Sequence, residues 1–254
     1  MDRRPSASTS VSFNRIAKQY DQTRGGEARG RAVAAILTEH LVPGLVLEVG
    51  VGTGVVAAGL REFGYPACGV DIAADMLVQA AERMPGLVSR GDATRLPFAT
   101  NTVHNVVCAH VLHLVANMDE AIAEAARVLR SGGRLVVLHG DAFADPDHDV
   151  TLAMDPLAPL RERQDSFEAL ATSSETAGLR VVTQHAVGPN ERGFSPRDFA
   201  DGMMKRQYPY LWGVDDQTWA RLVRPVIDGL LALPDPDRER PLAWWSPLSV
   251  FGKD

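Results

Sequence analysis

The sequence lacks an excess of basic residues, and this absence excludes one large class of functions. Its 26 Lys and Arg residues are outnumbered by 32 Asp and Glu residues, so the formal net charge is -6. Proteins that bind nucleic acid need clustered cations to replace the counterions of the phosphates. We therefore expect no nucleic-acid partner.

Cysteine and long apolar runs are also scarce. The two cysteines, Cys68 and Cys108, lie in short apolar runs, where a reduced cysteine packs as a small hydrophobic residue. No run approaches the roughly 20 apolar residues that cross a membrane. No apolar segment follows the polar start of the chain as it would in a signal peptide. We expect a cytoplasmic protein without membrane insertion.

The sequence does contain a regular alternation of apolar and amphipathic segments. From Leu45 onward, short apolar runs alternate with helical patterns, which is typical of a parallel sheet covered by helices. The run Val106–Ala109 is apolar without polar alternation, as in a central strand that is buried on both faces. The sequence therefore predicts a layered α/β fold.

The domain organisation is predicted to be simple. No internal repeat or long linker interrupts the 254 residues, and a hydrophobic content of 45% suffices for one core. We predict a single domain (1–254). Along it we expect a disordered tail (1–11), two helices (12–42), the α/β core (45–187), a helical insertion (188–241) and a final strand (242–254).

A glycine-rich turn, Leu47–Gly54, follows the first apolar run. Gly50, Gly52 and Gly54 stand between a strand and a helix, where residues without a side chain let the backbone turn tightly and approach a ligand. An ordinary strand-to-helix turn has a similar composition. The loop alone therefore indicates a nucleotide-binding turn without excluding a purely structural one.

Two aspartates follow the next two apolar runs. Asp71 stands 21 residues beyond Gly50, about where an acidic residue meets the hydroxyls of a ribose. An aspartate at this place can also cap the following helix. Asp92 follows the third run, where its carboxylate can accept the exocyclic amine of adenine. These positions predict a ligand that contains adenosine.

Glu48 bears on the choice between two kinds of cofactor. Enzymes that bind nicotinamide dinucleotides share the features above, but their loop is commonly Gly-x-Gly-x-x-Gly, whereas the glycines here alternate. A carboxylate at position 48 would repel a diphosphate and attract a ligand with an ammonium and a sulfonium. The charge pattern favours a cationic cofactor, and a nicotinamide-dependent oxidoreductase is the alternative.

The segments Glu48–Gly54, Asp71, Gly91–Ala93 and Leu96–Phe98 resemble, in order and spacing, the motifs of class I S-adenosylmethionine-dependent methyltransferases. The similarity is greatest to the small-molecule group that includes the quinone-biosynthesis methyltransferases. It implies a Rossmann-like fold, with a mostly parallel seven-stranded sheet between helices and an inserted helical lid before the last strand. The implied cofactor is S-adenosyl-L-methionine, and the implied substrate is a small molecule methylated on oxygen, nitrogen or carbon.

The resemblance also implies residue roles. Glu48 and the glycines would lie near the methionine moiety, Asp71 at the ribose, and Asp92 with Ala93 at the adenine. The full predicted cofactor set is Tyr20, Glu48, Gly50, Gly52, Gly54, Asp71, Ile72, Met76, Asp92, Ala93 and Ala109. In such folds the second and fourth strands lie on opposite sides of the first, so no disulfide is expected between the two cysteines.

Histidines are the candidate catalytic residues. Methyl transfer from a sulfonium is a direct displacement, in which positioning and desolvation provide much of the rate. A base helps where the acceptor is a hydroxyl or an acidic carbon. His110 and His113 follow the fourth strand, at the edge where open parallel sheets bind ligands. Each is a candidate base or a packing residue, and His139 ranks behind His110.

The remaining predictions concern partners. We interpret the carboxylates and histidine of Asp145–Asp149 as solvated, so no metal is predicted. The aromatic and cationic segment Lys205–Trp212 is predicted to recognise the acceptor or to form a packing seam, with Tyr20 as part of a lid. A monomer or homodimer is expected. Three alternatives remain: a non-catalytic S-adenosylmethionine-binding protein, a repurposed S-adenosylmethionine-binding enzyme of another reaction, and an interaction module built on Gly188–Pro241.

Overall fold

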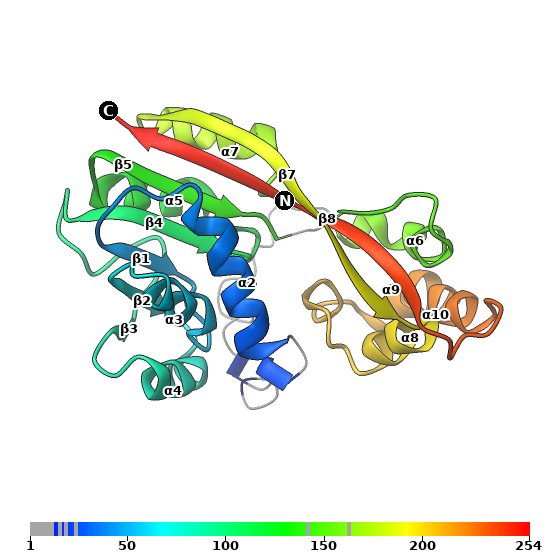
Figure 1. The fold of residues 1–254 in the computed structure, drawn as a ribbon. Coiled ribbons are helices and arrows are strands. Elements are labelled where there is room, and N and C mark those ends of the chain that lie inside the picture. Colours follow the sequence, from blue (N-terminus) through cyan, green and yellow to red (C-terminus); the bar gives the residue numbers. More distant parts are fainter. Residues whose placement is uncertain (1–12, 15–16, 18–19, 23–24, 141–142, 162–163) are drawn as a thin grey trace. The chain divides into compact units, whose positions relative to one another are not determined.

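The computed structural model describes residues 13–14, 17, 20–22, 25–140, 143–161 and 164–254, whose course is shown in Figure 1. The predicted tail (1–11) and part of the first predicted helix lie outside the described residues. The chain divides into two compact units. The core unit comprises Met1–Gly140, Gln164–His185 and Pro247–Asp254, and the second unit comprises Asp141–Arg163 and Ala186–Ser246.

The core unit alternates strands and helices, as the sequence predicts. Its elements in chain order are α2 (Gly26–Thr38), β1 (Val46–Val49), α3 (Val55–Glu62), β2 (Ala67–Asp71), α4 (Ala74–Arg83), β3 (Val88–Arg90), β4 (Val103–Ala109), a 3-10 turn (Leu112–Leu114), α5 (Met118–Val128), β5 (Leu129–Leu138), α7 (Phe167–Thr176), the start of β7 (Leu179–Phe194) and the end of β8 (Arg240–Lys253).

The strands form one mixed sheet in the order β3-β2-β1-β4-β5-β8-β6, with β7 pairing with β8. The pairings among β1 to β5 are parallel, and β8 runs antiparallel to β5. The mostly parallel sheet is thus confirmed. It has eight strands rather than seven, because the two-residue β6 (Phe143–Ala144) adds a short pairing to β8.

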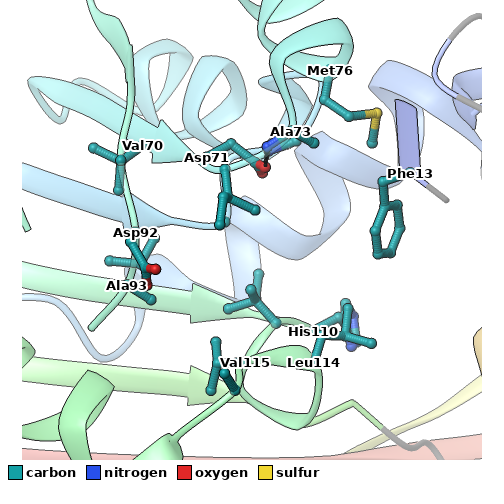
Figure 2. Close-up of a pocket in the computed structure, with 18 of the residues that line it drawn as sticks. Phe13, Val70, Asp71, Ala73, Met76, Asp92, Ala93, His110, Leu114 and Val115 are labelled. Atoms are coloured by element: carbon teal, nitrogen blue, oxygen red, sulfur yellow. Dashed lines mark hydrogen bonds between the residues drawn. The ribbon is translucent and has the colours of Figure 1, made fainter. Parts of the chain in front are cut away.

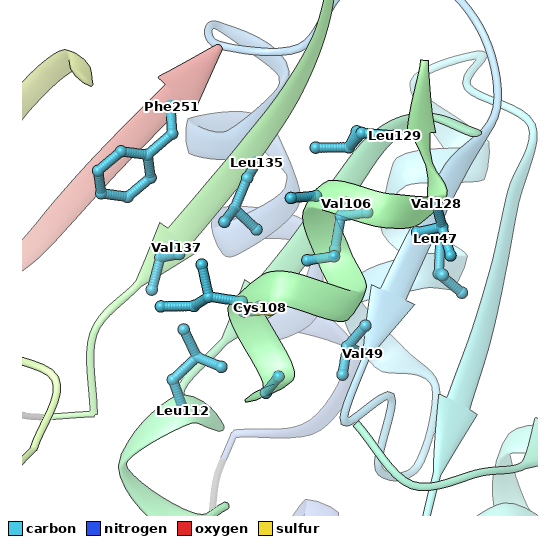
Figure 3. Close-up of a cluster of buried hydrophobic side chains, with 14 of the residues drawn as sticks. Leu47, Val49, Val106, Cys108, Leu112, Val128, Leu129, Leu135, Val137 and Phe251 are labelled. Atoms are coloured by element: carbon cyan, nitrogen blue, oxygen red, sulfur yellow. The ribbon is translucent and has the colours of Figure 1, made fainter. Parts of the chain in front are cut away.

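Apolar side chains cover both faces of this sheet. On one face, Leu47 of β1 and Cys108 of β4 belong to one buried cluster with Val128 of α5 (Figure 3). Successive strand residues point to opposite faces, and Val107, the neighbour of Cys108, is also fully buried. A fully buried Val or Leu contributes about 1.5–3 kcal/mol. The central position predicted for β4 is explained by this two-sided burial.

The two cysteines are both free thiols. Cys68 lies on β2 and Cys108 on β4, and β1 separates these strands. The expected absence of a disulfide between them follows from the strand order that the resemblance implies.

Helix α5 packs on one face of the sheet. It begins where the Asn117 side chain accepts a hydrogen bond from the Glu120 N–H, which satisfies one of the unpaired donors of a helix start. Its buried residues recur at helical spacing, so one face packs on the sheet and the polar residues stand beside it. The buried set is Met118, Ala121, Ile122, Ala125, Ala126 and Val128.

The second unit is mainly helical and has its own apolar core. Its elements are β6, α6 (Asp149–Met154), a 3-10 helix (Asp155–Leu160), α8 (Pro196–Met204), a 3-10 turn (Pro209–Leu211), α9 (Asp216–Thr218), a π-helical turn (Trp219–Val223) and α10 (Arg224–Leu231), with the remainder of β7 and β8. The insertion predicted for 188–241 therefore extends further, into 141–163. Compactness does not test whether either unit folds alone, so the single domain stays a prediction.

No helix within the described part of the chain has the length and apolar character needed to cross a bilayer.

Candidate cofactor site

A pocket in the core unit opens where β1, β2 and β4 end (Figure 2). Ten of the thirteen predicted site residues line it, and three do not: Glu48, Gly54 and His113. The lining residues are Phe13, Tyr20, Val49, Gly50, Gly52, Val70, Asp71, Ile72, Ala73, Met76, Gly91, Asp92, Ala93, Ala109, His110, Val111, Leu114, Val115 and Ala116.

The glycines of the loop after β1 serve two purposes. Gly52 has a φ of 55°, and a Cβ built there would meet Met76 Cε at 3.7 Å and no other described atom within 4 Å, so its place borders the open pocket. Gly54 has a φ of 82°, and a Cβ there would lie 3.2 Å from the Ala80 Cα of α4. Gly52 thus lets a ligand approach, whereas Gly54 lets two helices pack closely.

A network of hydrogen bonds connects this loop to α4 and to the segment that contains Tyr20. Thr53, which is 1% exposed, donates from Oγ1 to Asp21 Oδ1 at 2.6 Å. Arg83 donates to Thr53 O at 2.8 Å and to Asp21 Oδ2 at 2.6 Å. Asp21 adjoins Tyr20, so the segment that brings Tyr20 to the pocket is fastened to the loop. Sequence reasoning missed Thr53 and Arg83, although a threonine between two loop glycines is a visible signal.

Asp71 joins the loop to the start of α4. Its Oδ2 accepts the Gly52 N–H and its Oδ1 accepts the Ala73 N–H, both at 2.8 Å. Burial raises the pKa of Asp71, and these backbone donors oppose the rise. A carboxylate has about four acceptor sites, so the backbone bonds leave acceptor capacity for a ligand. The structural role and a ribose-binding role are therefore compatible rather than competing.

The walls of the pocket suit a flat ring. In Figure 2, Asp92 and Ala93 lie on one side, and Met76 and Phe13 lie on the other. Asp92 Oδ1 accepts the N–H and the Oγ1–H of Thr94, each at 2.9 Å, which fixes the orientation of its carboxylate. Ile72, which also lines the pocket, is 42% exposed.

Glu48 differs from its predicted position. Its side chain is 2% exposed, lies outside the pocket lining, and has an Oε2 with no hydrogen-bond partner among the described residues. Burial raises the pKa of Glu48 to about 8. A raised pKa reduces the charge of Glu48 near pH 7 when no ligand is bound, and the predicted selection of a cationic cofactor by this carboxylate stays a prediction.

His110 is the histidine that reaches the pocket. It has a φ of 56°, a left-handed conformation that is costly for a residue with a side chain. Its Nδ1 lies 2.6 Å from the His139 carbonyl oxygen. A carbonyl can only accept, so Nδ1 carries the hydrogen and Nε2 is the basic nitrogen of the neutral ring.

The other two candidate histidines pack inside the core unit. His113 Nδ1 lies 3.8 Å from Asp165 Oδ2, and a Cβ built at Gly140 would come within 2.0 Å of the same nitrogen. His139 is 3% exposed and bonds through Nε2 to Ser249 Oγ at 2.8 Å, and burial lowers its pKa. Both side chains are thus placed as the packing residues that the sequence analysis gave as the alternative to a catalytic base.

Comparison with known proteins bears on what this pocket holds. Residues 47–137 match the family described as "Methyltransferase domain". Demethylmenaquinone methyltransferase of Mycobacterium tuberculosis is 36% identical over 130 residues, which are 49% of this chain and 55% of that protein. The biotin biosynthesis bifunctional protein BioHC of Cellvibrio japonicus is 35% identical over 132 residues, which are 50% of this chain and 26% of that protein. The chain thus spans about half or less of these curated relatives.

We call residues 47–137, which match this family, the methyltransferase domain. The resemblance to S-adenosylmethionine-dependent methyltransferases is confirmed by this match. Solved structures share the fold alone. The [4+2]-cyclase SpnF has a TM-score of 0.63 at 17% identity and covers 98% of this chain and 97% of its own. Geranyl diphosphate C-methyltransferase from Streptomyces coelicolor has a TM-score of 0.53 at 15% identity, covering 88% of this chain and 79% of its own.

Most of the pocket belongs to this methyltransferase domain, but two lining residues precede it. Phe13 and Tyr20 stand edge to face, with ring centroids 6.2 Å apart. Their spacing of seven residues places them on one helical face, which is the signal by which Phe13 could have joined the predicted set. Val111, Leu114 and Val115 were also missed, although apolar residues just after β4 stand at the ligand-binding edge of the sheet.

Outside the methyltransferase domain, the aromatic segment Lys205–Trp212 contributes to the core of the second unit. Tyr208 and Tyr210 stack with centroids 5.6 Å apart, and the Arg206 guanidinium lies 4.3 Å from the Trp219 ring centre. Within the described residues, no group of three or more His, Cys, Asp or Glu side chains is arranged to hold a metal. Asp149 pairs with Arg240 at 3.1 Å instead.

Proposed function

We propose that this chain binds S-adenosyl-L-methionine in the pocket of the core unit and transfers its methyl group to a small organic molecule. The observation that carries this proposal is that Gly52, Asp71 and Asp92 meet around one pocket inside a methyltransferase domain. Each lies at the carboxyl end of a parallel strand, where such sheets bind ligands.

The pocket residues fit this cofactor in kind and order. The Asp71 carboxylate would accept the ribose hydroxyls, and Asp92 with Ala93 would contact the adenine edge. Ile72 and Met76 would flank the ring, and Gly50, Gly52, Ala109 and Tyr20 would surround the methionine moiety. Neither Glu48 nor Gly54 lines the pocket. Glu48 would support the loop by filling space in the core, and Gly54 would allow α3 and α4 to pack closely.

The bound cofactor supplies an electrophilic methyl group on a sulfonium. The chain has to place the acceptor atom in line with it, exclude water, and receive a proton where the acceptor carries one. His110 is the proposed base, because Nε2 is the basic nitrogen when Nδ1 donates to His139 O. His113 is not part of this proposal, because it packs against Gly140 away from the pocket.

The acceptor is proposed to be largely apolar around its reacting atom. Phe13, Val111, Leu114 and Val115 form much of the described lining, and Asp71, Asp92 and His110 are its ionisable residues apart from Tyr20. The demethylmenaquinone methyltransferases among the relatives are consistent with an apolar ring acceptor.

The test is transfer of isotopically labelled methyl from S-adenosyl-L-methionine to a panel of small phenols, quinols, amines and acidic carbon compounds. We expect labelled product with at least one apolar hydroxyl or acidic carbon compound. Tight cofactor binding without transfer to any acceptor in the panel would favour the non-catalytic binding protein instead. Light scattering of the same sample distinguishes monomer from homodimer.

A further inference from the structure

The loop that carries Asp92 stands at a weak edge of the sheet. It follows β3, which is three residues long, lies at the end of the strand order and pairs with β2 alone. The last backbone bond to the sheet is from the Gly91 N–H to Asp71 O at 3.0 Å. Among the residues that the structure describes, no second strand pairs with β3 to hold the loop as it continues to Phe98.

Two side chains of α5 hold the far end of the loop. Glu124 Oε2 accepts the Leu96 N–H at 2.8 Å. Arg127 donates to Leu96 O at 3.1 Å and to Phe98 O at 2.8 Å. The two side chains also bind each other, with Arg127 Nε 2.6 Å from Glu124 Oε1 and Nη2 2.8 Å from Oε2. We call this set of bonds the α5 clamp.

The α5 clamp differs from an ordinary surface ion pair. Exposed pairs between neighbouring turns of a helix contribute little to stability, and the side chains here are 20% and 33% exposed. Both partners, however, also bond to the backbone of a loop about thirty positions away in sequence. The planar fork of arginine can reach two carbonyls and a carboxylate at once, which a lysine ammonium cannot do with the same geometry.

Local hydrogen bonds connect the residues of the segment between the two anchors. Asp92 Oδ1 accepts two bonds from Thr94, and Asp92 O accepts the Arg95 N–H at 3.0 Å. A shift of Leu96 would therefore carry the turn from Asp92 to Arg95 with it. Small misplacements of a positioning group weaken a directional hydrogen bond steeply.

We propose that Arg127, together with Glu124, is a positioning residue that sets the place of Asp92 and thereby the preference of the site for a 6-amino purine over a 6-oxo purine. This inference rests on the proposed function, because it assumes that Asp92 meets the adenine amine. The competing explanation is that burial of Leu96, which is 5% exposed in the core, holds the loop without help.

The experiment compares calorimetric Kd values for S-adenosylhomocysteine and S-inosylhomocysteine, which differ in the amine that Asp92 would accept. The wild-type chain is expected to prefer the adenine compound by at least about tenfold, because the 6-oxo group faces a carboxylate without offering a donor. In Arg127→Met the preference is expected to fall below about threefold, mainly through weaker binding of S-adenosylhomocysteine. Arg127→Lys and Glu124→Gln are expected to fall between these values.

Arg130→Met is the matched control, since Arg130 donates from Nε to Asn101 O at 3.3 Å, outside the loop. It is expected to keep the wild-type preference. An unchanged preference in Arg127→Met, whether both ligands weaken equally or neither does, would overturn the inference alone. A wild-type chain that binds both compounds equally overturns it too. A wild-type chain that binds neither overturns the proposed function as well. If Arg127→Met does not fold, the ratio of the two Kd values is measured in Arg127→Lys and Glu124→Gln, and an unchanged ratio in both overturns the inference.

Discussion

The cofactor pocket and the second unit use polar and aromatic side chains in different ways. At the pocket, backbone N–H groups orient the Asp71 carboxylate, which keeps acceptor sites for a ligand. In the second unit, Arg206 lies over Trp219 and Tyr208 stacks on Tyr210, so these groups contact one another inside a core. A segment with many aromatic and charged residues therefore indicates a binding site only where the fold leaves some of their polar atoms facing a pocket, as it does for Asp71.

The largest expected effect comes from the core of the second unit. Leu230 is fully buried there, so Leu230→Ala should lower the free energy of unfolding by about 3 kcal/mol. Chemical denaturation measures this loss. Binding of S-adenosylhomocysteine at 25 °C should stay within threefold of wild type, because the pocket lies in the core unit. A loss of affinity for S-adenosylhomocysteine of more than threefold in Leu230→Ala would show that the core of the second unit also supports the cofactor pocket.

The next largest effect concerns the pocket. Asp71→Ala removes an acceptor for the ribose and for two backbone donors, and should weaken S-adenosylhomocysteine binding about 100-fold, or about 2.7 kcal/mol. Asp75→Ala, in the first turn of α4, is the control and should change the Kd less than twofold. Retained affinity in Asp71→Ala, measured by calorimetry, would reduce Asp71 to a structural residue.

A smaller effect is expected at His110. His110→Gln should lower kcat about thirtyfold with a hydroxyl or carbon acceptor that has to lose a proton during methyl transfer, while the Kd for S-adenosylhomocysteine stays the same. His113→Gln, by contrast, should lower Tm with little change in kcat, since His113 packs on Gly140. The reverse pattern would assign the base to His113.

The last prediction concerns Glu48, the buried acid that lies outside the pocket lining. The pKa of Glu48 is about 8 in the folded chain against an ordinary value of 4.5. Between these values the folded state holds more protons than the unfolded state, so stability falls as pH rises through this window. Glu48→Gln does not titrate. Its Tm advantage over wild type should therefore grow by at least about 3 °C from pH 5 to pH 8.

The fold and the cofactor side of the site could be predicted because both depend on local patterns. The glycines, Asp71 and Asp92 each follow an apolar strand, and parallel strands bring their carboxyl ends together. Contacts across long sequence separations were not predictable. The clamp of Arg127 on Leu96 and the pairing of Thr53 with Asp21 depend on how helices are placed. Composition also gave no sign that burial would raise the pKa of Glu48, or that His113 would pack against Gly140 rather than line the pocket.

The central claim is that the pocket of the methyltransferase domain binds S-adenosyl-L-methionine. Calorimetric titration of the chain with S-adenosylhomocysteine, and separately with NAD, tests it most directly. We expect one saturable site for S-adenosylhomocysteine with a Kd on the order of 1–100 μM, and no heat of binding from NAD. Binding of NAD with no response to S-adenosylhomocysteine would contradict the account and favour a nicotinamide-dependent oxidoreductase.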